Sequence, residues 1–110
     1  MELIVSEQQP FTVVKVKGKL DTGTADAFQE LCLQLLADGK NQLALDFEQL
    51  SYLSSAGLRG ILIAGKKAKA AKGKLVICHL SGMAGEVFSM SGFDGIFSVY
   101  KDLAELLAKG

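Results

Sequence analysis

The stretch that decides the fold is residues 42–73, QLALDFEQLSYLSSAGLRGILIAGKKAKAAKG. Its first part, Gln42 to Phe47, alternates large apolar residues with others and predicts a mostly buried strand. Its last part, Ala56 to Lys72, is rich in Ala, Leu, Ile and Lys and predicts a helix, which Gly73 closes at the position of a C-cap glycine. A serine-rich turn joins the two. A strand that leads through a short turn into a helix is typical of an α/β domain.

Periodicity on either side of this stretch predicts the other elements. From Ala25 to Leu36 the apolar residues have the spacing of one helical face, with Thr22 or Thr24 as cap and Gly39 as stop. Further strands are expected at Leu3–Val5, Thr12–Lys17, Lys74–Leu80 and Ile96–Val99, and short helices at Ala84–Met90 and Asp102–Ala108. The chain is therefore predicted to be one α/β domain over residues 1–110, with a mixed sheet of four or five strands and about four helices packed mainly on one side.

Composition limits the class of protein. A chain of 110 residues with 49% hydrophobic residues can bury one contiguous core. The first residues lack the pattern of a secretory signal, and no apolar run is long enough to span a bilayer. A cytoplasmic protein without membrane insertion is expected.

The cysteines predict neither a disulfide nor a metal site. Cys32 and Cys78 are far apart in the sequence, and each lies within an apolar pattern, which predicts buried free thiols. His79 is the only histidine, and no local cluster of ligands accompanies it. A structural zinc site therefore lacks the ligands that it needs, and no metal or cofactor is expected.

Charge is unevenly distributed along the chain. Residues 1–55 carry 8 acids and 4 bases and residues 56–110 carry 4 acids and 8 bases, so the net charge changes from −4 to +4. The bases between residues 59 and 74 have no acid among them. A solvated helix face is the favoured interpretation, and a docking face for an acidic or phosphate-bearing partner is the alternative. No aromatic residues interleave these lysines, so nucleic acid is not an expected partner.

The serine turn, residues 51–57, is the candidate functional feature. At a helix start the first N–H groups have no partners and the helix dipole adds positive partial charge, so the turn is a natural anion site. Either Ser54 or Ser55 could be the N-cap. With Ala56 and Gly57 beside them, the same serines are also candidates for phosphorylation, because a phosphate or another backbone can approach closely.

A serine nucleophile is the competing chemistry at this turn. A nucleophile elbow needs Gly-x-Ser-x-Gly, and Leu53 occupies the position of the first glycine. The only histidine, His79, lies in a predicted strand without obvious access. A small serine hydrolase is therefore a distant alternative, and no catalytic residues are assigned.

Four motifs in order resemble the STAS domain family, and within it the bacterial anti-sigma factor antagonists. The resemblance extends over the whole chain. The motifs are Gly18-Lys19-Leu20-Asp21 with Thr24-Ala25, Leu45-Asp46-Phe47 through Leu50-Ser51-Tyr52-Leu53, Ser54-Ser55-Ala56-Gly57-Leu58, and Met90-Ser91-Gly92-Phe93.

The resemblance implies a function for the serine turn. The family core motif is usually Asp-Ser-Ser-Gly-Leu or Asp-Ser-Ala-Gly-Leu, and its serine two places before the glycine accepts phosphate from an anti-sigma factor that is also a serine kinase. That position is Ser55 here, with Ser54 as the second candidate because it stands where the family commonly has aspartate. The implied partner surface consists of Asp21, Ser54, Ser55, Ala56, Gly57, Leu58 and Arg59.

The implied protein is a switch and not an enzyme. Unphosphorylated, it would bind the anti-sigma factor and free a sigma factor, and a serine phosphatase would be a further partner. Asp21 is expected either as an acidic group close to the turn or as an Asx-type cap. The alternative within the family is a STAS subunit of another signalling or lipid-transport assembly, which binds its partner without phosphorylation.

Overall fold

The computed structural model describes all residues, 1–110, as one α/β domain. Six strands form the sheet: β1 (Glu2–Gln8), β2 (Phe11–Leu20), β3 (Gln42–Asp46), β4 (Leu50–Leu53), β5 (Lys74–Cys78) and β6 (Val99–Tyr100). Four α-helices accompany them, α1 (Ala25–Ala37), α2 (Ser55–Ala70), α3 (Gly82–Met90) and α4 (Leu103–Lys109), with a short 3₁₀ helix at Phe93–Gly95. The predicted fold class is confirmed.

The sheet is mixed, in the order β1-β2-β3-β5-β6. Only the hairpin of β1 and β2 is antiparallel, while the other neighbours are parallel and are connected by helices. The additional strand, β4, lies off this path and pairs with the end of β2. It falls in the segment that the sequence pattern assigned to the approach to the serine turn, and so the sheet has one strand more than expected.

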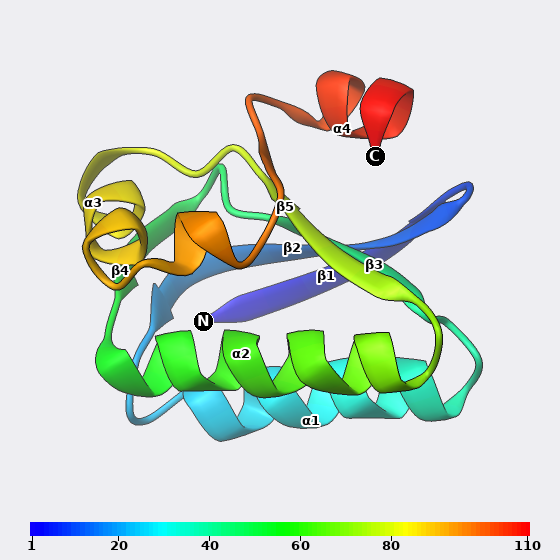
Figure 1. Ribbon diagram of the computed structural model, residues 1–110. Coiled ribbons are helices and arrows are strands. Elements are labelled where there is room, and N and C mark those ends of the chain that lie inside the picture. The colour runs from blue at the N-terminus through cyan, green and yellow to red at the C-terminus, as the bar shows by residue number, and fades with distance from the viewer.

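The helices divide between the two faces of the sheet (Figure 1). α1 and α2 lie side by side across one face, and α4 lies against the other. The larger core, on the α1 and α2 side, contains 18 buried residues, and α3 contributes Ala84 and Phe88 to it. The smaller core contains 6 buried residues, among them Leu106 of α4. Helix packing is therefore mainly on one side, as predicted, and α4 is the exception.

Both cysteines are free and buried, as predicted. Cys32 belongs to the larger core and Cys78 to the smaller one. Burial raises the pKa of the Cys32 thiol to about 12. Burial also raises the pKa of Cys78 to about 12, and the negative charges of Asp46, Asp102 and Glu48 add to this effect.

Helix α2 ends differently from its prediction. The residue with the left-handed backbone is Lys72, with φ 62°, and not Gly73. The Gly73 N–H donates to Ala68 O and the Lys72 N–H donates to Lys69 O, which together form a Schellman motif. Gly73 has a different role, because a Cβ there would lie against the backbone carbonyl of Asn41.

Candidate functional site

The serine turn lies where β2, β4 and α2 meet. The register between β2 and β4 shifts between Gly18 and Lys19, and Gly18 has φ +98°, a conformation that favours glycine. Beyond this bend the end of β2 pairs with β4. The Ser54 N–H then donates to Leu20 O at 3.0 Å, so the start of α2 is fastened to the end of β2.

Gly57 allows this close approach. A Cβ at residue 57 would lie 2.6 Å from Leu20 O and 2.9 Å from the side chains of Leu20 and Leu53. The backbone that approaches Gly57 is therefore that of β2, inside the protein. Gly57 sets the position of the helix start and is itself buried.

The two serines have different roles in the structure. Ser54 has the extended backbone of an N-cap, φ −100° and ψ 174°, and its Oγ accepts a hydrogen bond from the Gly57 N–H at 3.3 Å. Ser55 is the first residue of α2 and is exposed, and its hydroxyl makes no hydrogen bond within the chain. The cap is therefore Ser54, and the hydroxyl of Ser55 is free.

The predicted partner surface is only partly accessible. Ser55 and Arg59 are exposed, Asp21, Ser54 and Ala56 are half-buried, and Gly57 and Leu58 are buried. Leu58 packs in the larger core, because the apolar face of α2 turns toward the sheet. Gly57 and Leu58 therefore shape the turn from within, and their side of the helix offers no surface to a partner.

Asp21 organises the neighbouring turn between β2 and α1. Its Oδ1 accepts a hydrogen bond from the Gly23 N–H at 3.0 Å, which is the Asx arrangement. Thr24 precedes α1 but does not cap it, since its hydroxyl donates to Lys19 O and accepts from the Asp21 N–H. Asp21 is thus a structural residue of this turn, and it also remains partly exposed.

The surface near Ser55 includes residues that the sequence pattern did not indicate. A groove of about 400 Å³ lies between the starts of α1 and α2, lined by Thr22, Ala25, Asp26, Gln29, Ala56, Arg59 and Ile63. Tyr52 of β4 is 40% exposed, although its neighbour Leu53 is buried. Ser51 and Tyr52 are both exposed between buried Leu50 and Leu53, and the sequence pattern placed Tyr52 in the serine turn without assigning it to the partner surface.

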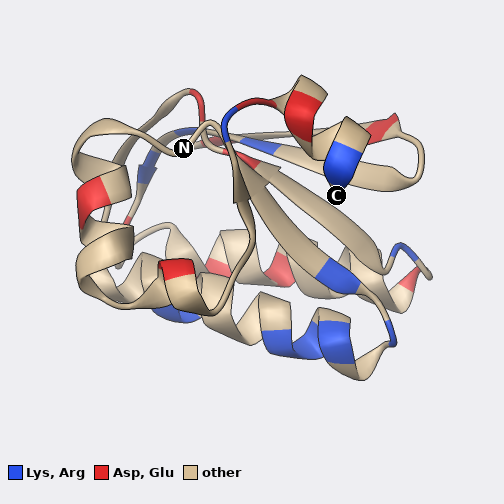
Figure 2. Cartoon of the chain, turned by 45° about the horizontal axis from the view of Figure 1, so that its top comes forward, with Lys and Arg blue, Asp and Glu red and all other residues tan.

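Positive charge lies mainly at the other end of α2. Figure 2 marks the Lys and Arg positions in blue, several of them on the second half of this helix, and Lys66, Lys67 and Lys69 are exposed there. Exposure of these lysines agrees with the solvated face that the charge pattern favoured and equally with the alternative, a docking face. At the start of α2 the only base is Arg59, one turn after Ser55 at the i+4 position.

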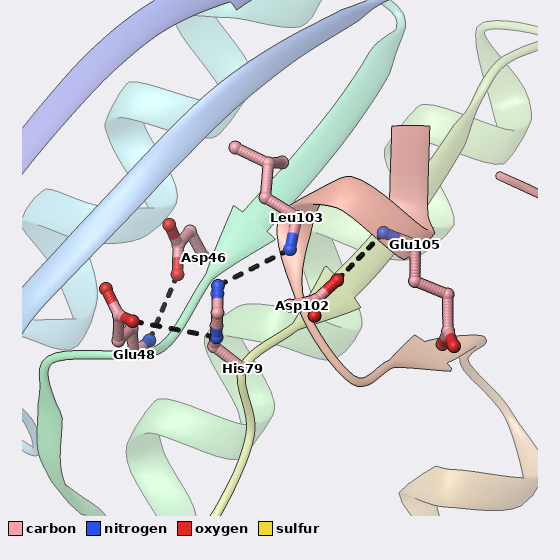
Figure 3. A network of polar contacts seen from close by, with 6 residues as sticks. All are labelled: Asp46, Glu48, His79, Asp102, Leu103 and Glu105. Carbon is pink, nitrogen blue, oxygen red and sulfur yellow. Dashed lines mark hydrogen bonds and ion pairs between the residues drawn. The ribbon is translucent and has the colours of Figure 1, made fainter. Parts of the chain in front are cut away.

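His79 contacts Leu103 and Glu48, and no hydrogen bond joins it to the serine turn (Figure 3). Its Nε2 accepts a hydrogen bond from the Leu103 N–H at 3.4 Å, and its Nδ1 lies 3.8 Å from Glu48 Oε2. Both ring nitrogens thus face other groups, and no feature of the site supports a serine hydrolase. His79 also lies close to Asp46 and Cys78, a cluster that the sequence did not indicate.

Comparison with known proteins identifies the family of this α/β module. The STAS domain model matches residues 2–106, and the chain belongs to the STAS domain family. A protein of Bordetella bronchiseptica that carries the name anti-sigma factor antagonist, BtrV, is 31% identical over 90% of this chain and 85% of its own length. The anti-sigma-B factor antagonist of Staphylococcus aureus is 29% identical over 90% of this chain and 92% of its own length.

Solved structures agree on the fold. The anti-sigma factor antagonist SpoIIAA, in its unphosphorylated form, superposes with a TM-score of 0.73 at 17% identity, over 97% of this chain and 94% of SpoIIAA. Its phosphorylated form, from Bacillus, gives 0.76 at 19% identity over 98% of both chains. In this chain, none of the helices has the length and apolar character that crossing a membrane requires.

Proposed function

We propose that the chain is an anti-sigma factor antagonist whose binding to an anti-sigma factor is switched by phosphorylation of Ser55. The observation that carries this proposal is that the two serines have different structural roles. Ser54 holds the cap of α2, which leaves the exposed hydroxyl of Ser55 free for a kinase. The names of the relatives, all anti-sigma factor antagonists, support the same function.

The surroundings of Ser55 favour a phosphate. The N–H groups of Ser55 and Ala56 lie in the first turn of α2, where backbone donors lack helical partners and the helix dipole favours negative charge. The exposed Arg59 lies at the i+4 position, within reach of a phosphate on Ser55. A phosphoserine therefore adds about −1.5 to −2 charge without loss of fold stability.

The charge of a phosphate on Ser55 would weaken the binding of a partner protein to this surface. The partner surface consists of Ser55, Ala56 and Arg59 with the adjoining groove, and Tyr52 adds an exposed aromatic side chain of the kind that dominates binding energies. A phosphate at the centre of this surface would have to lose its hydration when a partner covers it, which weakens binding. Phosphorylation therefore ends the complex, and a serine phosphatase restores it.

Ser54 is a poorer phosphoacceptor. Its Oγ accepts the Gly57 N–H, and the residue is half-buried, so a kinase would have to break the cap to reach it. In this proposal the chain is a kinase substrate in the cytoplasm and not an enzyme. Its partner is an anti-sigma factor with serine kinase activity.

The direct test is to map the modified residue. The protein is incubated with ATP and the anti-sigma factor kinase of the source organism, and peptides are analysed by mass spectrometry. We expect phosphate on Ser55, normal phosphorylation of Ser54→Ala and Ser51→Ala, and none of Ser55→Ala. Ser51 is the matched control, because it is also exposed and lies in adjacent β4. Phosphate on Ser54 alone would assign the phosphorylation site to Ser54. Binding of the partner without phosphorylation of any residue would favour a STAS subunit of another assembly.

A further inference from the structure

Three potential metal ligands lie close together at the ends of β3 and β5. None of them belongs to the serine turn. In the parallel pair, Asp46 is the register partner of Cys78. Two residues earlier, Ala44 and Val76 point into the smaller core on the α4 side. Side chains alternate along a strand, so Asp46 and Cys78 project from this same face.

His79 completes the group. It follows β5 with a left-handed backbone, φ 61°, which is uncommon for a residue other than glycine. One ligand atom each of Asp46, Cys78 and His79 lies within 4.8 Å of the others. Asp46 and Cys78 are buried and His79 is half-buried, so the group is open to solvent on the histidine side.

Negatively charged side chains gather near this group. Asp46 lies in the cluster itself, and burial raises the pKa of the Cys78 thiol, which the charges of Asp46, Asp102 and Glu48 raise further. No lysine or arginine forms an ion pair with any of these carboxylates. Asp46 Oδ1 accepts the Glu48 N–H at 3.1 Å, Asp102 Oδ1 accepts the Glu105 N–H at 2.8 Å, and Glu48 Oε2 lies 3.8 Å from His79 Nδ1. Asp46 is the buried one of the three. Buried carboxylates are normally paired or bound to a cation.

We propose that Asp46, Cys78 and His79 form a binding site for a thiophilic divalent cation, with Zn²⁺ the best match. Thiolate, imidazole and carboxylate are the ligands that Zn²⁺ takes in proteins, and three of them leave a fourth position for water. Zinc–ligand bonds of about 2.0–2.3 Å at tetrahedral angles place ligand atoms about 3.3–3.8 Å apart. The side chains therefore need to close by about 1 Å, and the thiol proton leaves to solvent on binding.

The histidine is held in a suitable state (Figure 3). Nε2 accepts the Leu103 N–H, so it carries the lone pair, and Nδ1 is left to hold the proton toward Glu48. A cation at Nε2 would replace only this long contact of 3.4 Å. Glu48 would then orient the ring from behind, as carboxylates do for metal-bound histidines.

A purely structural role is the competing account, because the same contacts fasten the start of α4 to β5. Loss of stability in a variant does not separate the two accounts. Metal binding itself has to be measured, and buried Cys32 provides a matched cysteine outside the cluster.

The experiment is a Zn²⁺ titration of reduced, chelator-treated protein against a chromogenic competitor. We expect about one equivalent of Zn²⁺ at micromolar protein for wild type and Cys32→Ser, and at least a 100-fold loss of affinity for Cys78→Ser and His79→Gln. Glu48→Gln, which keeps all three ligands, should lose about 10–100-fold. Co²⁺ in place of Zn²⁺ should give a thiolate-to-metal absorption band in wild type.

Two results would overturn the proposal. One is the absence of stoichiometric Zn²⁺ binding or of the Co²⁺ thiolate band in wild type. The other is equal affinity in wild type, Cys78→Ser and His79→Gln. Circular dichroism checks that the variants fold, and if one does not, Glu48→Gln and the Co²⁺ band of wild type still decide.

Discussion

Gly57→Ala tests how tightly the start of α2 is fitted to β2. The new Cβ would lie 2.6 Å from Leu20 O, the carbonyl that also accepts the Ser54 N–H. Relief requires that α2 move away from this carbonyl. Overpacking costs about 1–3 kcal/mol and a weakened hydrogen bond about 1 kcal/mol, while alanine in a helix recovers about 1 kcal/mol. The net effect is a loss of about 2 kcal/mol of unfolding free energy.

Gly60→Ala is the matched control in the same helix. Its Cβ would meet Phe28 Cδ2 at 3.5 Å and Ala25 O at 3.7 Å, which are ordinary contacts. The variant should therefore gain about 0.5–1 kcal/mol from helix propensity. The two variants should differ by about 3 kcal/mol in urea unfolding, or on the order of 10–20 °C in melting temperature. Equal stabilities of Gly57→Ala and Gly60→Ala would refute the close approach of Leu20 as the reason for glycine.

Further predictions concern the caps and a buried thiol. Ser54→Ala should lose about 1 kcal/mol in urea unfolding because it removes the cap, and Ser55→Ala should lose almost nothing; the reverse order would place the cap on Ser55. Lys72→Gly should gain about 1 kcal/mol in the same assay, because glycine adopts the φ of 62° without strain, and a loss would contradict this. The Cys32 thiol has a pKa of about 12 in the folded protein and 9.0 in the unfolded chain. Its contribution to the free energy of unfolding is therefore fully present below pH 9 and is lost as the pH rises toward 12. The slope is up to about 1.4 kcal/mol per pH unit, and denaturant melts of Cys32→Ala should show a shallower fall; identical slopes would contradict the raised pKa.

Local periodicity was sufficient for most of the fold. The hairpin, α1, α2 and β5 follow from apolar spacing, because each element turns one face to the core. β4 was missed because Leu50–Leu53 is short and is a strand only through its pairing with β2 beyond the bend at Gly18. Tertiary pairing, and not propensity, makes it a strand.

The site was predictable in position but not in its details. Ser54 and Ser55 cap equally well by residue type, and the bond from Ser54 N–H to Leu20 O sets which of them precedes the helix. The neighbourhood of Asp46, Cys78 and His79 depends on the register of β3 against β5, which no local pattern contains. In the sequence only Cys78 and His79 are adjacent, and Asp46 lies far from both.

The affinity of the anti-sigma factor for Ser55→Asp tests the central claim most directly. Aspartate suits the first turn of a helix, so this variant should fold as well as wild type while it places a fixed charge on the proposed docking surface. Ser6→Asp is the control, since Ser6 is exposed on β1 opposite Val13, about 23 Å along β2 from Leu20. Calorimetric titration of the anti-sigma factor should give wild-type affinity for Ser6→Asp and Ser55→Ala and at least about tenfold weaker binding for Ser55→Asp. Unchanged affinity of Ser55→Asp would contradict a phosphorylation switch at Ser55.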